Sequence, residues 1–286
     1  MIRLFGVIGC PVNHSLSPVM HAAAFQALRL DALYSAFEVP PRFLAPMLRA
    51  LVLAGVEGLN VTVPLKETVL PLLDRLEPAA KAIGAVNTIV ISNRRTVGYN
   101  TDGVGFRTAL CALGWRFAPA RVVVLGAGGS ARAVAWELAA TPGTELTIAN
   151  RHVDRARHVS RWLARHRPRV RVHAASLAGV SLEGVDLLVN ATTVGMRATD
   201  RCPVDLATLS KDSLVYDLVY HRQTALIRAA RRRGCVAAGG QSMLLYQAAE
   251  SLRLWLKRPP PIAAMRRALQ LRLPRAMTND QIPRSK

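Results

Sequence analysis

The strand and helix signals of this chain alternate almost from end to end. Apolar runs such as residues 3–9 (RLFGVIG) and 121–125 (RVVVL) are followed by longer segments with apolar residues at helical spacing. Such alternation is typical of a mostly parallel sheet wrapped by helices. The predicted fold class is therefore α/β.

The length of 286 residues allows two domains of ordinary size, each with its own core. A first series of elements ends near Asp102, and a second begins at Arg121 after a helix and a loop over 103–115. Within the first series we expect a helix at 18–30, a strand at 58–64, a helical stretch at 70–84 and strands at 85–93 and 95–101.

Membrane insertion, secretion and metal binding find no support in the sequence. No apolar run reaches the roughly 18–20 residues of a membrane span, and the N-terminus reads as a strand rather than a signal peptide. The four cysteines (Cys10, Cys111, Cys202, Cys235) lack the CxxC or CxxH spacing of zinc ligands. We therefore expect reduced thiols, a cytoplasmic location and no metal.

The net charge of +20 raises the question of a polyanionic partner. Arginines cluster most heavily at residues 151–171, where Arg157, Arg161 and Arg165 recur every four residues and indicate a solvated helix face. No aromatic-interleaved RNA motif, zinc finger or glycine–arginine tract accompanies them. The charge pattern favours a basic enzyme without a specific nucleic-acid partner.

A glycine turn joins the apolar strand 122–125 to a helix. It has the pattern G-x-G-x-x-A, in which Gly126 allows a tight turn, Gly128 lets the backbone approach a pyrophosphate, and Ala131 lets helix and strand pack closely. The exposed amides at the start of the helix would face the phosphates. The turn predicts a Rossmann-type dinucleotide site, with an ordinary strand–helix turn as the alternative; the candidates are Gly126, Ala127, Gly128, Gly129 and Ser130.

The next strand, 145–150, indicates which nicotinamide cofactor fits. An NAD site usually has Asp or Glu at this strand end, whereas this strand ends in Asn150, followed by Arg151 and Arg155. Two guanidinium groups can hold a 2′-phosphate through charge-assisted hydrogen bonds. We therefore predict NADP rather than NAD.

A dinucleotide domain in the second half leaves the first half for the substrate. Ser15 and Ser17 are two residues apart, so that in an extended segment both hydroxyls point the same way. Helix capping before Pro18 could explain Ser17 but not Ser15. Together the two serines predict a small anion-binding corner suited to a carboxylate.

Lys66 stands at the end of the stretch LNVTVPLKE, residues 59–67. Ligands bind at strand ends in α/β sheets, so Lys66 is a candidate for chemistry. An exposed lysine in a turn is the alternative.

With these motifs the chain resembles the shikimate dehydrogenases over nearly its whole length, from Gly6 to about Leu273. The motifs that carry the resemblance are HSLSP (14–18), NVTVPLK (60–66), GAVNT (84–88), GYNTDGVGF (98–106), GAGGSARA (126–133), NR (150–151), NATTVGM (190–196), YDLVY (216–220) and GGQSMLLYQA (239–248).

The resemblance implies reversible NADP-linked oxidation of shikimate to 3-dehydroshikimate, with Lys66 and Asp102 as the catalytic pair. Ser15 and Ser17 would hold the substrate carboxylate. The ring hydroxyls would be bound by Thr62, Asn87, Asp102, Tyr220 and Gln247. Leu218, Gly240 and the loop 190–196 would lie near the nicotinamide.

The resemblance also implies that the helix bearing Gln247 returns to the first domain. The substrate domain would then comprise 1–102 and 247–286, and the NADP-binding domain 103–246, in a monomer or homodimer. Chemistry supports the proposed pair, because hydride removal from a secondary alcohol leaves a proton for a positioned base, and a desolvated lysine amine can serve. Asn87 and Asp102 have turn or capping roles as alternatives.

Two other functions stay open at the level of sequence. One is a quinate/shikimate dehydrogenase with broader substrate use and NAD preference, which Arg151 and Arg155 argue against. The other is a basic dinucleotide-binding regulator without catalysis, which would require a defect in Lys66 or Asp102 that the sequence does not contain.

Overall fold

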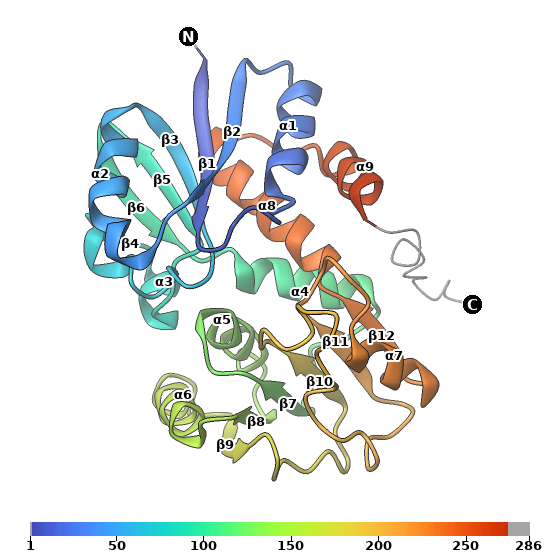
Figure 1. The fold of residues 1–286 in the computed structure, drawn as a ribbon. Helices are drawn as coiled ribbons and strands as arrows, with labels where there is room; N and C mark the ends of the chain where they lie inside the picture. Colours follow the sequence, from blue (N-terminus) through green and yellow to red (C-terminus); the bar gives the residue numbers. More distant parts are fainter. Residues whose placement is uncertain (1, 274–286) are drawn as a thin grey trace. The chain divides into compact units, whose positions relative to one another are not determined.

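The computed structural model describes residues 2–273. The chain forms two compact units, one built from Met1–Gly105 and Leu245–Arg272 and the other from Phe106–Leu244 (Figure 1). It passes between them within helices α4 (Asp102–Ala112) and α8 (Gln241–Leu256). Residues 274–286, which we expected in the substrate domain, lie outside the described residues.

The first unit contains a six-stranded sheet of order β2-β1-β3-β5-β6-β4. Its strands are β1 (Arg3–Gly9), β2 (Ala32–Glu38), β3 (Val56–Val61), β4 (Arg75–Leu76), β5 (Thr88–Ser92) and β6 (Arg95–Tyr99). The pairs β1–β2, β1–β3 and β4–β6 are parallel, whereas β5 runs antiparallel to both of its neighbours. The predicted α/β class with a mostly parallel sheet is confirmed.

Strand β3 shows how the sequence divides this sheet between its two faces. Leu59 and Val61 are buried in the core beneath helix α2 (Leu44–Leu53). Gly58 and Asn60 point to the opposite face, because successive side chains of a strand alternate. There, Gly58 leaves room for the indole of Trp255, whose Nε1 donates a 2.9 Å hydrogen bond to the Ile89 carbonyl.

The helical stretch predicted at 70–84 is correct only in its last part. Helix α3 spans Pro78–Ile83 and is capped by the Glu77 carboxylate, which accepts from the amide of Ala79 (2.9 Å). Residues before it form a 3₁₀ turn at Leu70–Leu72 and then strand β4, which pairs with β6. The remaining helices of this unit are α1 (Ser17–Ala27) and α9 (Ile262–Arg272).

The second unit contains a six-stranded sheet of order β12-β11-β10-β7-β8-β9, parallel throughout. Its strands are β7 (Arg121–Leu125), β8 (Glu145–Asn150), β9 (Arg171–Ser176), β10 (Leu187–Asn190), β11 (Leu214–Asp217) and β12 (Val236–Gly239). The chain order reverses between β7 and β10, and ligands of such sheets bind at the carboxyl ends of the strands beside this reversal.

Three further helices pack on this sheet: α5 (Gly129–Leu138), α6 (Val153–His166) and α7 (Ala225–Arg232). The interior is aliphatic, with Val123 and Leu125 of β7, Leu188 of β10 and Leu226 of α7 in one cluster. Buried strands of this kind read as continuous apolar runs, which is why the sequence revealed them.

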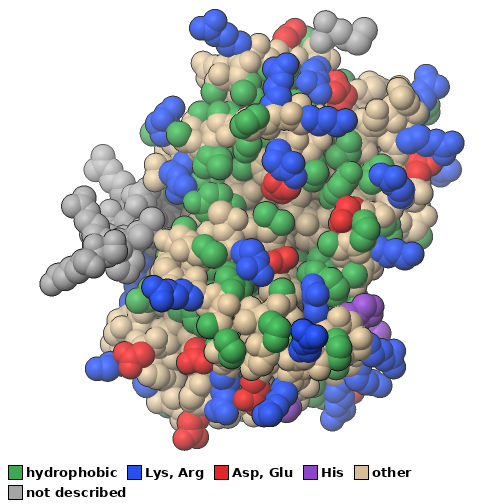
Figure 2. All heavy atoms as spheres, turned by 180° about the vertical axis from the view of Figure 1, so that it is seen from behind, with side chains coloured by type: hydrophobic (Ala, Val, Ile, Leu, Met, Phe, Trp, Pro, Cys, Tyr) green, Lys and Arg blue, Asp and Glu red, His purple; other side chains and the backbone are tan. Residues whose placement is uncertain are grey.

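The basic residues do not gather in a single patch on the face shown in Figure 2. Figure 2 shows lysine and arginine side chains dispersed over the face in view, with acidic side chains among them. No helix among residues 2–273 is long and apolar enough to cross a membrane.

Candidate active site

Four strands of the first unit's sheet begin or end at the same edge. Strands β1 and β3 run parallel and end there at Gly9 and Val61. Because β5 is antiparallel to β3 and β6 is antiparallel to β5, β5 begins at this edge with Thr88 and β6 ends at it with Tyr99. The segments that carry Ser15, Ser17, Thr62, Lys66, Asn87 and Asp102 adjoin these strand ends, whereas Gln247 lies on helix α8.

Lys66 and Asp102 form an ion pair at this edge. Lys66 lies in the turn after β3, and Asp102 is the first residue of α4. The Lys66 Nζ atom lies 2.5 Å from Oδ2 of Asp102, and the two side chains are 13% and 5% exposed. Lys66 is thus not an exposed turn lysine. A mostly buried amine beside a carboxylate can exchange a proton with the hydroxyl of a bound molecule.

Asn87 joins this pair to the rest of the edge. Its Nδ2 donates to Oδ1 of Asp102 (2.8 Å) and to Oε1 of Gln247 (3.2 Å), and its Oδ1 accepts from the backbone amide of Thr101 (2.7 Å). Asn87, Asp102 and Gln247 are all buried. The Asn87 side chain is therefore not occupied with a local turn and fixes the orientation of the carboxylate instead.

The serine corner differs from the prediction in one respect. Helix α1 begins at Ser17 itself, so Leu16 is in the capping position and no side chain caps the helix. The Ser15 hydroxyl accepts a 3.3 Å hydrogen bond from the Ser17 amide. Helix capping therefore does not explain Ser17, which is 5% exposed, and Ser15 has the local backbone role instead.

Thr62 follows β3 directly and is half-buried. Its amide donates to the Ile8 carbonyl of β1 (2.9 Å), and its methyl group occupies the space that a side chain on Gly9 would need. The close approach of Thr62 to the end of β1 thus requires glycine at position 9.

A buried polar network behind these residues escaped the sequence analysis. Asn60 Oδ1 accepts from the Tyr34 hydroxyl (2.8 Å), and Asn60 Nδ2 donates to Ser251 Oγ (2.9 Å). Ser251 also lies within hydrogen-bond distance of Thr88 Oγ1 (2.7 Å) and Thr101 Oγ1 (3.2 Å). The one available signal was an asparagine inside a buried apolar strand, because a buried amide requires partners.

In the second unit, the glycine turn has the geometry that its sequence predicts. Gly126 has φ +114°, and a side chain there would lie 2.8 Å from the Ala191 carbonyl oxygen. A side chain on Gly128 would meet no atom within 4 Å, so the space above the turn is open. Helix α5 starts at Gly129 without a side-chain cap, and Ala131 is fully buried. Ala127 and Ser130 are half-buried beside the turn. The amides of this helix start are therefore available to a phosphate.

The end of β8 carries no acidic residue. Asn150 donates from Nδ2 to the His152 carbonyl (3.0 Å), while Arg151 and Arg155 are exposed. Within residues 2–273 neither guanidinium has an ion-pair partner. This donor set fits a phosphate group on a nucleotide ribose.

Leu218, Tyr220 and Gly240 lie at the ends of β11 and β12. Gly240 packs so closely on the Leu218 backbone carbonyl that any side chain at position 240 would collide with it. The Gly240 amide donates to the Val219 carbonyl (3.1 Å). Burial raises the pKa of the Tyr220 phenol to about 12, so that its hydroxyl stays protonated at neutral pH.

Asp217, the last residue of β11, is a buried carboxylate that the sequence analysis did not select. It accepts from Asn190 Nδ2 (2.9 Å), the Val219 amide (3.0 Å) and Thr224 Oγ1 (2.7 Å). Burial raises the pKa of Asp217 to about 6 despite these hydrogen bonds. The carboxylate ties the loop after β10 to the connection between β11 and α7.

The predicted site residues thus form two groups, one in each unit. All the substrate-binding candidates except Tyr220 lie in the first unit, and Lys66, Asn87, Asp102 and Gln247 are linked there by hydrogen bonds. The cofactor-binding candidates lie in the second unit, together with Tyr220. Residues 2–273 contain no cluster of three or more His, Cys, Asp or Glu side chains that could hold a metal ion.

Three family models match consecutive parts of the chain. Residues 7–89 match the shikimate dehydrogenase substrate binding domain, residues 109–209 match shikimate / quinate 5-dehydrogenase, and residues 240–270 match the shikimate 5′-dehydrogenase C-terminal domain.

Relatives with known names extend over almost the full length. The shikimate dehydrogenase (NADP(+)) of Rubrobacter xylanophilus is 45% identical over 269 residues, which cover 93% of this chain and 95% of the relative. That of Moorella thermoacetica is 44% identical over 272 residues, covering 93% and 92%. Among solved structures, a shikimate dehydrogenase in complex with NADP⁺ has a TM-score of 0.90 at 36% identity and covers 96% of both chains. The shikimate 5-dehydrogenase of Thermus thermophilus in complex with NADP(H) and shikimate has a TM-score of 0.85 at 36% identity, covering 95% of this chain and 100% of that one.

Proposed function

This chain belongs to the shikimate dehydrogenase family, and on that premise we propose that it interconverts shikimate and 3-dehydroshikimate with NADP(H). The observation that carries the chemical part of the proposal is the Lys66–Asp102 pair, which stands beside the hydrogen-bonded Asn87 and Gln247 at one sheet edge. The reaction would serve the shikimate pathway of aromatic amino-acid biosynthesis.

Lys66 acts as the acid–base group in this proposal. In the oxidation of shikimate, its amine takes the proton of the hydroxyl that becomes a carbonyl, and in the reduction its ammonium group returns that proton. Asp102 holds the Lys66 Nζ atom and accepts from Asn87 on its other oxygen, so that neither group has to reorient during the reaction.

Substrate binding is assigned to groups of matching chemistry. The hydroxyls of Ser15 and Ser17 receive the substrate carboxylate. Asn87, Asp102 and Gln247 present amide and carboxylate atoms to the ring hydroxyls, together with Thr62 and with the protonated Tyr220 phenol of the second unit.

The second unit supplies the cofactor site. The turn formed by Gly126, Ala127, Gly128, Gly129 and Ser130 holds the pyrophosphate, with Gly126 shaping the turn while its own amide donates to the Ala149 carbonyl (2.7 Å). Asn150, Arg151 and Arg155 hold the 2′-phosphate side, and Leu218 and Gly240 lie by the nicotinamide. Bound NADP supplies the hydride acceptor or donor. The guanidiniums of Arg151 and Arg155, which have no ion-pair partner in the described part of the chain, and the lack of an acid at the end of β8 support NADP over NAD.

Four free cysteines in the described residues agree with a reducing compartment, and we propose a cytoplasmic location. We propose further that the protein acts as a monomer or homodimer and that its basic surface serves no specific nucleic acid.

The test is turnover of the purified protein with each combination of shikimate or quinate and NADP⁺ or NAD⁺, followed by the absorbance of the reduced nicotinamide. The proposal predicts reduction chiefly with shikimate and NADP⁺. Comparable turnover of quinate with NAD⁺ would favour a quinate/shikimate dehydrogenase with NAD preference. One structural relative, the quinate dehydrogenase of Corynebacterium glutamicum in complex with NAD, has a TM-score of 0.84 at 32% identity. No turnover with any combination would contradict the proposed reaction.

A further inference from the structure

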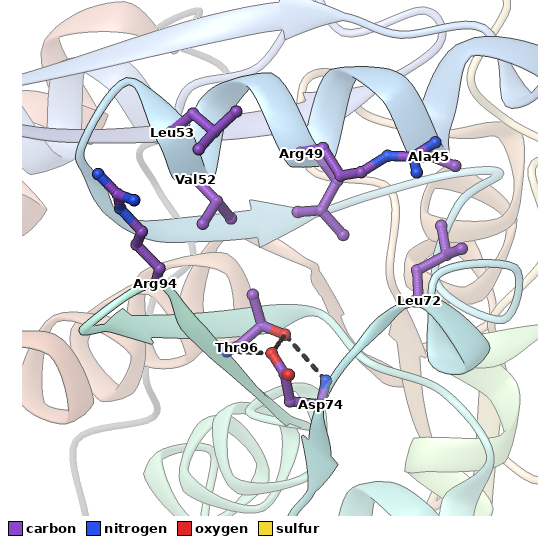
Figure 3. A pocket seen from close by; sticks show the side chains of 9 residues that line it. Ala45, Arg49, Val52, Leu53, Leu72, Asp74, Arg94 and Thr96 are labelled. Atoms are coloured by element: carbon purple, nitrogen blue, oxygen red, sulfur yellow. Dashed lines mark hydrogen bonds between the residues drawn. The ribbon is translucent and has the colours of Figure 1, made fainter.

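The first unit has a hollow of about 470 Å³ between helix α2, the segment that leads into β4, and the start of β6. Its walls are the apolar side chains of Leu48, Val52, Leu53 and Leu72, with Arg49 and Arg94 beside them (Figure 3). None of the predicted site residues lines it. The volume lies within the roughly 300–1,000 Å³ of small-molecule sites in proteins.

We propose that this hollow is a second ligand site, which takes a small carboxylic acid with an apolar body. The proposal does not depend on the enzymatic function, because the hollow lies within one unit and shares no residue with the proposed catalytic edge.

The apolar walls are the first argument. Leu53 is 68% exposed and Leu72 is 38% exposed, which places two of the large exposed apolar side chains of the described chain at one hollow. Exposed apolar side chains that gather around a concavity mark binding sites, whereas isolated ones carry no such meaning. An apolar group seated between Val52, Leu53 and Leu72 would remove this surface from water.

The charge of the hollow is the second argument. Asp74 also lines it, but its carboxylate already accepts from the Thr96 amide (2.8 Å), the Thr96 hydroxyl (2.8 Å) and Arg95 (2.7 Å). Across residues 2–273, Arg49 and Arg94 have no ion-pair partner. Two uncompensated guanidiniums beside an apolar wall suit a carboxylate attached to an apolar group.

The backbone at Arg94 is the third argument. Asn93 and Arg94 form the two-residue turn between β5 and β6, with φ of +50° and +60°. Glycine is the usual second residue of such a turn, because it adopts positive φ without steric cost. The chain instead keeps an arginine there, and Figure 3 shows it on the turn that faces α2, with Val52 and Leu53 between it and Arg49.

The test is direct binding of phenylacetate, measured by calorimetric titration and by the chemical shifts of the Leu53 and Leu72 methyl groups. Phenylacetamide, which has the same shape without the charge, serves as the neutral comparison. We expect phenylacetate to shift both methyl groups and to bind at least about tenfold more tightly than the amide, as a charge-assisted hydrogen bond would provide.

The double variant Arg49→Gln/Arg94→Gln should lose this preference by about tenfold, since it removes the charged partner at either end of the hollow. The matched control is Arg29→Gln/Arg267→Gln, which removes two exposed arginines of the same unit that do not line the hollow, one of them also at positive φ. Both variants should keep wild-type turnover, which shows that they fold.

Three outcomes would overturn the proposal. Equal binding of phenylacetate and phenylacetamide would make the hollow an apolar surface without anion preference. Equal loss in the control variant would trace binding to the general positive charge. A concentration-dependent dimer that Leu53→Gln dissociates would identify the hollow as a contact with a second copy of the chain.

Discussion

Asn87 donates a hydrogen bond to one carboxylate oxygen of Asp102 (2.8 Å), while Lys66 holds the other (2.5 Å). The two bonds fix both oxygens, so that the plane of the carboxylate, and with it the position of the lysine amine, is set by residues of three separate strand ends. The arrangement predicts that Asn87 acts in the reaction beyond any contact with the substrate.

Replacing Asn87 by alanine should lower kcat by about 10- to 100-fold, the effect of losing a hydrogen bond to a charged group. The carboxylate would then lack one of its two fixed partners, and the lysine would be poorly oriented. Steady-state kinetics with shikimate and NADP⁺ measure the effect. A change confined to KM would show that Asn87 binds substrate without orienting Asp102.

Arg151 and Arg155 should decide the choice of cofactor. The double variant Arg151→Gln/Arg155→Gln should raise KM for NADP⁺ by about 10- to 100-fold and leave KM for NAD⁺ nearly unchanged, because only NADP⁺ carries the 2′-phosphate. The control is Arg161→Gln/Arg165→Gln, on the exposed side of α6. An equal rise for both cofactors would argue that the arginines act only through general charge.

His21 should make the protein sensitive to acid. Its ring stacks on Tyr34 with centroids 4.4 Å apart, and neither nitrogen has a hydrogen-bond partner among residues 2–273. Burial lowers the pKa of His21 to about 3. The unfolded chain therefore binds a proton at higher pH than the folded protein does, and stability falls as pH drops from about 6.5 toward 3.

The variant His21→Phe keeps the stacking surface and removes the titration. Between pH 7 and pH 4.5, the free energy of unfolding of the wild type should fall by about 2–3 kcal/mol more than that of His21→Phe, at about 1.4 kcal/mol per pKa unit. Urea denaturation at each pH measures both values. Parallel pH profiles of the two proteins would show that His21 does not carry the effect.

Asp217 should have the opposite effect on the pH dependence of stability from that of His21. Burial raises the pKa of its carboxyl group from 3.8 to about 6, so the folded protein holds the proton more tightly than the unfolded chain. The contribution to stability is complete below about pH 4 and is lost as pH rises through 6, by about 3 kcal/mol. The variant Asp217→Asn should lack this decline in urea unfolding. If it shows the wild-type decline between pH 4 and pH 7, another group is responsible.

The parts of the fold that are determined by residues close together in the sequence could be predicted. The glycine turn at 126–131 and the continuous apolar strands of the second unit are local patterns, and the structure shows them where the sequence indicates. The helical stretch predicted at 70–84 is wrong over residues 70–77 for a non-local reason: Asp74 exchanges hydrogen bonds with Thr96, and β4 pairs with β6. Pairing of this kind overrides local helical preference.

The same distinction applies to the site. The lysine at a strand end and the serine pair could be selected from local sequence, and the other substrate residues came from the family motifs. The network of Asn60 with Ser251 joins residues 191 positions apart, and the three bonds of Asp217 depend on the ends of two neighbouring strands. A serine before proline favours a capping role for Ser17, but the helix begins one residue earlier than expected, at Ser17 itself.

The most direct test of the account is the turnover of Lys66→Met with saturating shikimate and NADP⁺. The matched control is Lys81→Met, an exposed lysine on α3 of the same unit. We predict that Lys66→Met keeps a cooperative thermal unfolding transition and binds NADP⁺ like the wild type, but loses about 10²- to 10⁴-fold in kcat, the usual contribution of a positioned acid–base group. A folded Lys66→Met variant with kcat within a few-fold of the wild type would contradict the assignment of the proton transfer to Lys66.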